Sequence, residues 1–221
     1  MKKIFFVGNS YTGFNDMPTM FKKLAVAGGF DVVTDKVTKG GCDLRTYLTK
    51  GDERGDRFYS IFESEDWDCV ILQEQSARPA IDESEFASAA DEMCDLIYKK
   101  GAEPLFYQTW PYRNKTEKLA TTNCTYIEFY QKLRDAYRRA AAKNHADFVP
   151  IGDVFYRMSI NHPEVNLLLE DNYHPNFNGS YLIALMFYFH FFGKEAPVLY
   201  RPEEVTEDAA DIIIASIKET I

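Results

Sequence analysis

The chain has few cysteines, and their spacing argues against two common kinds of structural support. Four cysteines stand at positions 42, 69, 94 and 124 of 221 residues, with no Cys-x-x-Cys pair and no histidine at ligand spacing. Structural zinc sites use such close pairs, so we predict no metal site and interpret the thiols as reduced and mostly buried. A chain of this length buries about 70% of the surface that its unfolded form exposes, so it can fold without disulfides.

Positive charge is also scarce. The chain has 25 Lys and Arg residues against 34 Asp and Glu residues, which gives a net charge of −9. Nucleic acids and anionic membrane surfaces are negatively charged and would be repelled by such a protein. We therefore expect neither of them as a partner.

Long hydrophobic runs are absent. The most apolar run, Tyr181 to Phe192, has about 12 residues and contains His190, whereas a membrane-spanning helix needs roughly 20. The start of the chain, Met1 to Val7, imitates a signal peptide with its two lysines. Its apolar part stops at Gly8 and is shorter than the roughly 7 to 15 residues of a signal sequence. We interpret it as a first strand and expect a cytoplasmic protein, with secretion as the alternative if a leader was removed.

Short apolar runs alternate with segments of helical periodicity. The runs are rich in Val, Ile and Phe, as buried strands are, and comprise Lys3–Val7, Asp31–Val37, Asp68–Leu72, Pro104–Tyr107 and Asp147–Pro150. The predicted helices are Met17–Gly28, Glu83–Lys100, Cys124–Asn144 and Phe177–Phe192. This alternation predicts an α/β fold, a flavodoxin-like three-layer sandwich with a five-stranded parallel sheet and helices on both faces. No repeat or linker divides it, so we expect residues 1–221 to form a single domain.

In such sheets a ligand binds beyond the carboxyl ends of the strands. The loop after the first predicted strand is Gly8-Asn9-Ser10-Tyr11-Thr12-Gly13. A small residue, a serine and a turn into a helix can expose a serine hydroxyl for catalysis. The same loop could instead cradle a phosphate or be a simple turn. It is neither the Gly-x-Ser-x-Gly elbow nor a nucleotide P-loop.

Two further loops could supply hydrogen-bond donors. After the second strand, Gly40-Gly41 lets the backbone approach a ligand and frees an N–H group, although a plain turn would look the same. After the third strand comes Gln73-Glu74-Gln75-Ser76. A glutamine amide can donate to an oxyanion, and the alternative is a solvated loop.

One of the four histidines stands apart. His145 lies at a predicted helix end, His162 in a predicted surface loop, and His190 on the apolar stripe of a helix, where we expect a core residue. His174 follows Asp171 by three residues in a loop that ends at a proline. This spacing can bring a carboxylate to the Nδ1 side of the imidazole and leave Nε2 free for another partner.

The order of these motifs resembles the SGNH (GDSL-type) hydrolase superfamily over nearly the whole chain. Gly8–Thr12 matches the nucleophile block with Asn9 in place of Asp, Gly41 matches the glycine block, and Asp171–His174 matches the last block. The sequence departs from the third block, Gly-x-Asn-Asp, with Gln73 at the Gly position and Gln75 at the Asn position. A less-studied branch of the superfamily is suggested by Trp67-Asp68, Leu72–Ser76 and Thr109-Trp110.

The resemblance implies a serine esterase that acts on a small-molecule or carbohydrate ester without a cofactor. Ser10 would be the nucleophile, His174 the base and Asp171 its partner, with an oxyanion hole of Ser10, Gly41 and Gln75. Aromatic residues make up 15% of the chain, and Trp110 and Tyr112 follow the fourth strand, where they could stack on a sugar or simply pack the loop. We expect substrate contacts from Asn9, Tyr11, Gln73, Trp110 and Tyr173.

Other interpretations remain open at this stage. Arg78 or Arg113 would suit an anionic group on the substrate. A phosphate- or nucleotide-binding module and a catalytically silent interaction protein are the alternatives to an enzyme. The oligomeric state is not predicted.

Overall fold

A five-stranded parallel sheet forms the centre of the protein. The computed structural model describes residues 1–221. The strands are β1 (Lys2–Gly8), β2 (Val32–Thr38), β3 (Cys69–Leu72), β4 (Glu103–Tyr107) and β5 (Asp147–Val149), in the order β2-β1-β3-β4-β5. All neighbouring strands pair in parallel. The predicted flavodoxin-like α/β fold is confirmed, and each predicted strand lies within one or two residues of an observed one.

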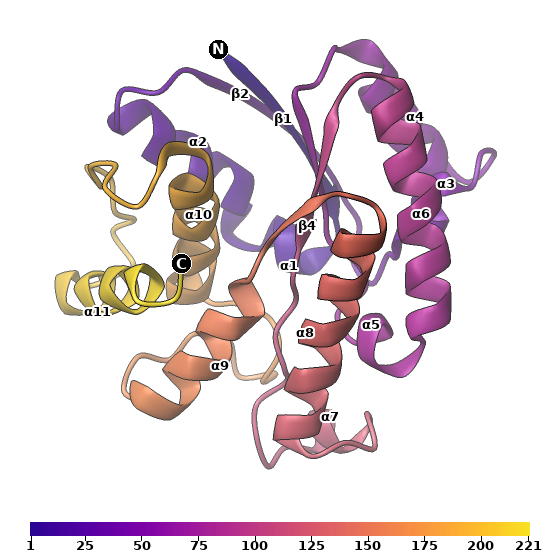
Figure 1. Ribbon diagram of the computed structural model, residues 1–221. Coiled ribbons are helices and arrows are strands. Elements are labelled where there is room, and N and C mark those ends of the chain that lie inside the picture. The colour runs from indigo at the N-terminus through magenta and orange to yellow at the C-terminus, as the bar shows by residue number, and fades with distance from the viewer.

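Helices cover both faces of the sheet because strand residues alternate in direction. Ile4 and Phe6 of β1 belong to one buried cluster, and Phe5 and Val7 belong to the other. The first face carries α2 (Met17–Ala27), α9 (Ile151–Asn161), α10 (Phe177–Phe192) and α11 (Glu207–Lys218). The second carries α3 (Leu44–Leu48), α4 (Glu53–Ser64) and α6 (Glu83–Lys99), with α8 (Tyr126–Lys143) contributing to both clusters (Figure 1).

Side-chain caps determine where the longer helices begin. The Asp82 carboxylate accepts from the Glu85 N–H at the start of α6, and Asn176 accepts from the Gly179 N–H at the start of α10. Helix α8 begins at Tyr126 rather than at Cys124, because Thr125 and Glu128 form a capping box there. Helices α4, α9 and α11 were not among those predicted. The short helices are α1 (Ser10–Gly13), a 3₁₀ turn at Phe14–Asp16, α5 (Arg78–Ile81) and α7 (Glu117–Ala120).

The cysteines were expected to be reduced and mostly buried, and His190 was expected to be a core residue. All four cysteines are free, three are buried and Cys124 is partly buried, as expected. His190 is not a core residue: it lies at the surface in the last turn of α10, with Nε2 3.8 Å from the Asp147 carboxylate. No helix of the structure combines the length and the apolar character that crossing a membrane would require.

The order of the strands opens a crevice at their carboxyl ends. Strand β1 lies between β2 and β3, so the connections on either side of it leave toward opposite faces. The end of β1 also packs tightly against side chains of α1 and of the residue that follows β3: a Cβ on Gly8 would lie 2.4 Å from Thr12 Oγ1 and 2.6 Å from Gln73 Oε1. Glycine is therefore required where the chain turns from β1 into α1.

Candidate active site

Ser10, His174 and Asp171 form a continuous line of hydrogen bonds above the end of β1. Ser10 Oγ lies 2.8 Å from His174 Nε2, and His174 Nδ1 lies 2.6 Å from Asp171 Oδ2. With the imidazole proton on Nδ1, the ring donates to Asp171 and accepts from the Ser10 hydroxyl. The sequence separates Ser10 from His174 by 164 positions, so only the fold brings them together.

The loop from Asp171 to His174 holds the imidazole in a fixed orientation. The other carboxylate oxygen of Asp171 accepts the backbone N–H groups of Tyr173 and His174 at 3.1 and 3.0 Å. Partial burial works to raise the pKa of Asp171, but the hydrogen bond from His174 and these backbone bonds outweigh it and lower the pKa. The Phe14 ring stacks on the imidazole with centroids 4.4 Å apart. Asp171 is therefore held ionised beside a ring that cannot rotate freely.

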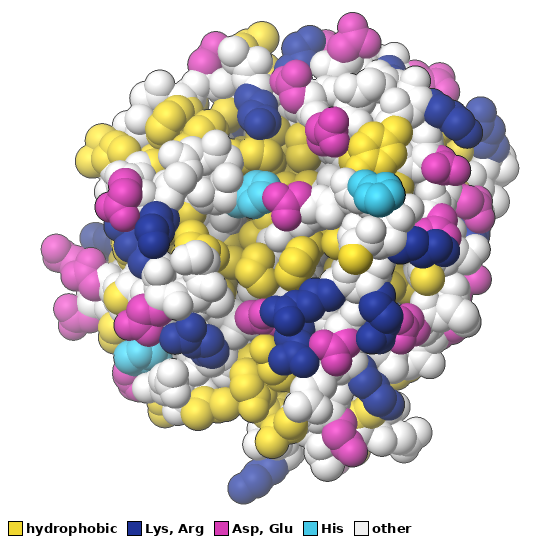
Figure 2. Space-filling model, in the orientation of Figure 1, with side chains coloured by type: hydrophobic (Ala, Val, Ile, Leu, Met, Phe, Trp, Pro, Cys, Tyr) yellow, Lys and Arg dark blue, Asp and Glu magenta, His cyan; other side chains and the backbone are white.

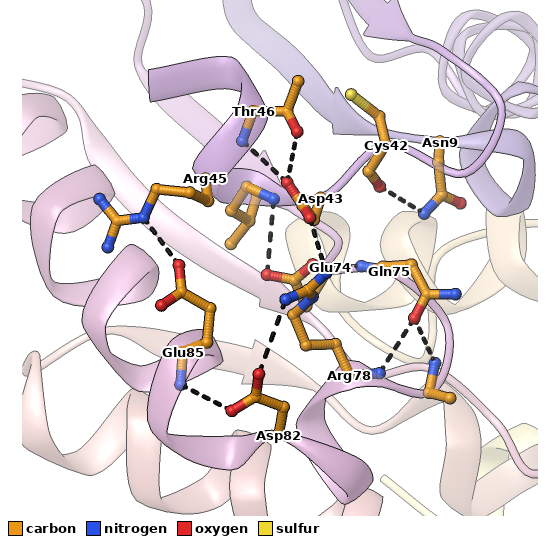
Figure 3. Close-up of polar contacts among 12 residues, drawn as sticks. Asn9, Cys42, Asp43, Arg45, Thr46, Glu74, Gln75, Arg78, Asp82 and Glu85 are labelled. Carbon is orange, nitrogen blue, oxygen red and sulfur yellow. Dashed lines mark hydrogen bonds and ion pairs between the residues drawn. The ribbon is translucent and has the colours of Figure 1, made fainter. Parts of the chain in front are cut away.

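Asn9 joins the serine turn to the loop after β2. Its Oδ1 accepts from the Tyr11 N–H and caps α1, while its Nδ2 donates to the Cys42 carbonyl at 3.0 Å (Figure 3). An aspartate at this position could make the first contact but has no N–H for the second. Asn9 also lines the cavity around Ser10, so the position predicted for substrate contact carries a structural link as well.

Backbone N–H groups of two loops are available next to Ser10. Neither the Ser10 nor the Gly41 N–H has an acceptor in the protein, and both residues line the same cavity. Gly41 has φ of +70°, a conformation that favours glycine. Gln75 lines this cavity too: its Oε1 accepts the Ala77 and Arg78 N–H groups, and its Nε2 donates to Ser76 Oγ at 3.1 Å. That amide has a second N–H to offer.

A buried carboxylate lies behind these loops and was not singled out by its sequence position. Glu74 is completely buried, and it accepts from the Leu44 N–H at 3.4 Å and from the Gln75 N–H at 2.5 Å. Figure 3 shows it between the two loops, beside the Arg78–Asp43 ion pair, whose atoms are 2.9 Å apart. Burial raises the pKa of Glu74 to about 7, and the Gln75 N–H opposes this effect. Glu74 thus connects the Gly41 loop to the Gln75 turn.

Two residues predicted to contact substrate are in the wrong place for it. Gln73 is completely buried, and its Oε1 accepts from the Asn9 N–H at 3.0 Å and the Thr12 hydroxyl at 2.9 Å. Trp110 is also completely buried, between Tyr11 and Phe155, with ring centroids 4.1 Å away on each side. Its Nε1 donates to the Tyr173 carbonyl. Both predictions of substrate contact are therefore wrong. These side chains are buried and contact the residues that line the site, namely Asn9, Tyr11 and Tyr173.

The cavity around Ser10 has a volume of about 500 Å³. It is lined by Asn9, Ser10, Tyr11, Phe14, Gly40, Gly41, Gln75, Ser76, Lys118, Tyr173 and His174. Tyr11 shows only its edge there, being 1% exposed. Phe14 and Lys118 were not predicted. Phe14 follows Ser10 by four residues, which was the only available signal, whereas Lys118 comes from α7 and has no local motif.

The arginines proposed for an anionic group are placed elsewhere. Arg78 pairs with Asp43 behind the loops, and Arg113 lines a separate cavity of about 510 Å³ between α8, α9 and the loop after α9. Neither lines the cavity around Ser10, so this expectation is wrong for both. No group of three His, Cys, Asp or Glu side chains is arranged to hold a metal ion.

The chain is similar to several proteins of known structure. No family model and no curated protein matches it. A candidate SGNH hydrolase from Slackia heliotrinireducens is 27% identical, with a TM-score of 0.77 over 85% of this chain and 97% of that one. A DUF4886 family protein from Bacteroides uniformis is 18% identical, with a TM-score of 0.79 over 99% and 94%.

A third likeness is to an acetyl xylan esterase, AlAXEase, at 16% identity and a TM-score of 0.62, covering 85% of this chain and 98% of that one. At such identities the second and third likenesses show the fold alone, and they agree with the first. The strand order is common to many flavodoxin-like proteins, whereas the first of these neighbours is described as an SGNH hydrolase. The chain belongs to the SGNH/GDSL-type hydrolase superfamily.

Proposed function

We propose that this protein is a serine-dependent ester hydrolase in which Ser10, His174 and Asp171 act as a catalytic triad. The observation that carries the proposal is the pair of contacts at His174: 2.8 Å from Nε2 to Ser10 Oγ and 2.6 Å from Nδ1 to Asp171. A nucleophile, a base and a group that orients the base are the three parts that such chemistry needs. The hydrolase and esterase neighbours support the same reaction class.

In the first half of the reaction, Ser10 Oγ attacks the ester carbonyl carbon while His174 Nε2 takes the hydroxyl proton. Asp171 holds the Nδ1 proton and stabilises the imidazolium that forms. The tetrahedral intermediate then collapses, the bond to the alcohol breaks, and His174 returns its proton to the leaving oxygen. Ser10 is left as an acyl ester.

In the second half, a water molecule takes the place of the alcohol. His174 removes a proton from the water as its oxygen attacks the acyl carbon. The second intermediate then collapses, the bond between the acyl carbon and Ser10 Oγ breaks, and His174 returns its proton to Oγ as the acid is released. Neither half calls for a metal ion or an organic cofactor.

The negative charge of both intermediates needs donors on one side of Ser10. We assign this role to the Ser10 N–H, the Gly41 N–H and the Gln75 amide. The two backbone groups have no acceptor in the protein, and all three residues line one cavity. Loss of a single donor of this kind typically lowers kcat by about 10² to 10³.

The test of the nucleophile is Ser10→Ala. We expect it to fold normally and to lose nearly all turnover of 4-nitrophenyl acetate, and we expect a fluorophosphonate probe to label the native protein but not this variant. Ser60→Ala, at an exposed position of α4, is the matched control and should retain full activity and labelling. Unchanged turnover in Ser10→Ala would refute the proposal.

A phosphate-binding role for the Gly8–Gly13 loop has less support. Most N–H groups that would cradle a phosphate are already used: Tyr11 donates to Asn9 Oδ1, and Thr12 and Gly13 donate to the Asn9 carbonyl, which leaves only the Ser10 N–H of these four. A binding module would bind nucleotide and remain unlabelled by the fluorophosphonate probe. The proposed esterase gives the opposite pair of results.

The proposed substrate is an acyl or acetyl ester, with a carbohydrate as one candidate carrier. The acetyl xylan esterase among the neighbours is consistent with this candidate, although its likeness extends only to the fold. Trp110 no longer supports it, since that ring is buried. Tyr173 is the remaining predicted aromatic residue with partial exposure in the cavity. Release of acetate from acetylated and deacetylated xylan would test this candidate directly.

A further inference from the structure

The cavity around Ser10 contains a single permanent charge. Among its eleven lining residues no aspartate or glutamate occurs, and Lys118 is the only lysine or arginine. Asp171 stands behind His174 and does not line the cavity, and its carboxylate is occupied by the imidazole and two N–H groups. A ligand in this cavity therefore meets one uncompensated cation.

Lys118 has no carboxylate partner. The lysines that form ion pairs are Lys3, Lys36 and Lys143, and Lys118 is not one of them. Most lysines of the chain are likewise unpaired, so the feature that distinguishes Lys118 is its position on the lining of the cavity around Ser10. Figure 2 shows the ordinary arrangement on one face, where basic and acidic side chains are interspersed.

Two tyrosine rings hold the Lys118 ammonium near the reacting groups. Its Nζ lies 4.3 Å from the centre of the Tyr173 ring and 5.1 Å from that of Tyr112, within the range of cation–π attraction. The Tyr173 ring in turn lies 4.1 Å from the His174 imidazole, centre to centre. The Tyr173 ring thus lies close to both the Lys118 ammonium and the imidazole of the proposed base. The two tyrosine rings restrict the motion of the lysine side chain.

We propose that the physiological ester carries a negatively charged group, such as a carboxylate, and that Lys118 binds this group while Ser10 attacks the ester carbon. This inference rests on the proposed function and specifies its substrate class. An anion in the cavity gains the attraction of the lysine and meets no lining carboxylate that would repel it. Lys118 is then a specificity-determining residue.

The test uses two matched pairs of esters that differ in charge. Mono-4-nitrophenyl adipate and 4-nitrophenyl hexanoate compare a carboxylate with a methyl group on the acyl side. 4-Acetoxybenzoate and methyl 4-acetoxybenzoate compare a carboxylate with a neutral methyl ester on the alcohol side of the acetyl ester. The measured quantity is the ratio of kcat/KM for the anionic ester to that for its neutral partner, and the pair that responds shows which side of the ester faces Lys118.

We expect Lys118→Met to lower this ratio about five- to tenfold in at least one pair of esters. This is the effect expected from loss of one partly exposed hydrogen bond between charged groups. Lys118→Arg keeps the charge and should retain most of the native ratio. Raising the salt concentration from 0.05 to 0.5 M should lower the ratio of the native protein but not that of Lys118→Met. Equal ratios in the native protein and Lys118→Met, for both pairs, would overturn the proposal.

Lys115→Met is the matched control for net charge. Lys115 is exposed, precedes α7 and does not line the cavity, so this variant should keep the native ratio. An equal fall in both variants would mean a general charge effect and would also overturn the proposal. Failure of the esterase proposal has a different signature, namely no Ser10-dependent turnover of any of the four esters.

Discussion

At the scale of single residues, the protonation states of His174 and Asp171 determine when the site can act. His174 must be neutral to take the Ser10 proton, so protonation of Nε2 at acid pH removes the base. The pKa of Asp171 is lowered, so this carboxylate is held ionised beside the ring that it orients.

From this assignment we expect kcat/KM to be lower at pH 5 than at pH 8, because a protonated imidazole cannot accept the Ser10 proton. Asp171→Asn keeps the size of the side chain but removes its charge, and should lower kcat by about 10³ to 10⁴. Initial rates with 4-nitrophenyl acetate across this pH range measure both effects. A rate that does not change between pH 5 and 8 would argue against His174 as the base.

At the scale of elements, the buried Glu74 carboxylate links the loops that carry the proposed oxyanion donors. Its pKa of about 7 lies above the ordinary 4.5 because the group is buried. Between these two pH values the folded protein holds a proton that the unfolded chain has lost. The contribution of Glu74 to the free energy of unfolding should therefore decrease as the pH rises from about 4.5 to about 7, by about 3 kcal/mol.

The variant Glu74→Gln removes this titration and keeps the shape of the side chain. We expect it to be less stable than the native protein at pH 5, because its amide nitrogen faces a backbone N–H that needs an acceptor. The difference should narrow or reverse by pH 8. Urea unfolding at both pH values measures it. Glu85→Gln, which alters a surface carboxylate on Arg45, should show no such convergence, and a constant difference for Glu74→Gln would contradict the assignment.

Some elements follow from local sequence patterns, and others do not. The strands were predictable because buried parallel strands are short apolar runs, and α10 because its residues are apolar between Asn176 and Gly193. Helix α9 begins without a side-chain cap. Helices α4 and α11 do carry local signals that were not used, since Asp52 and Thr206 cap their first turns and acidic residues follow. Their amphipathic faces stabilise them only once they pack on the sheet or on neighbouring helices.

At the scale of the whole molecule, the two buried clusters on either side of the sheet enclose most of the thiols. Burial raises the pKa of Cys69 and Cys94 to about 12, and raises that of Cys42 as well. Cys124 is only partly buried. A thiol is reactive as the thiolate, so three of the four cysteines should be inert in the folded state.

We therefore expect one thiol to react rapidly with a chromogenic disulfide reagent in the native protein and four to react after denaturation. Cys124→Ser should abolish the rapid reaction and leave three thiols to react in denaturant. A rapid reaction that persists in this variant would show that one of the buried thiols is accessible, and would contradict the packing described above.

The sequence alone was enough to propose the reaction class of the site and to predict the parallel α/β sheet that carries it. The motifs at Ser10, Gly41 and Asp171–His174 can each be recognised from a few neighbouring residues, because each lies in one loop. The strands around them are recognisable as short apolar runs. Asp171 and His174 are three residues apart, so their contact needs only a turn.

Only the tertiary structure decided which polar and aromatic side chains face the cavity. Trp110 and Gln73 lie in the expected loops but point into the core, and Lys118 enters from α7 through a connection that carries no motif. The direction of a loop side chain depends on what packs against it from distant parts of the chain. That information is not contained in the spacing of residues within the loop.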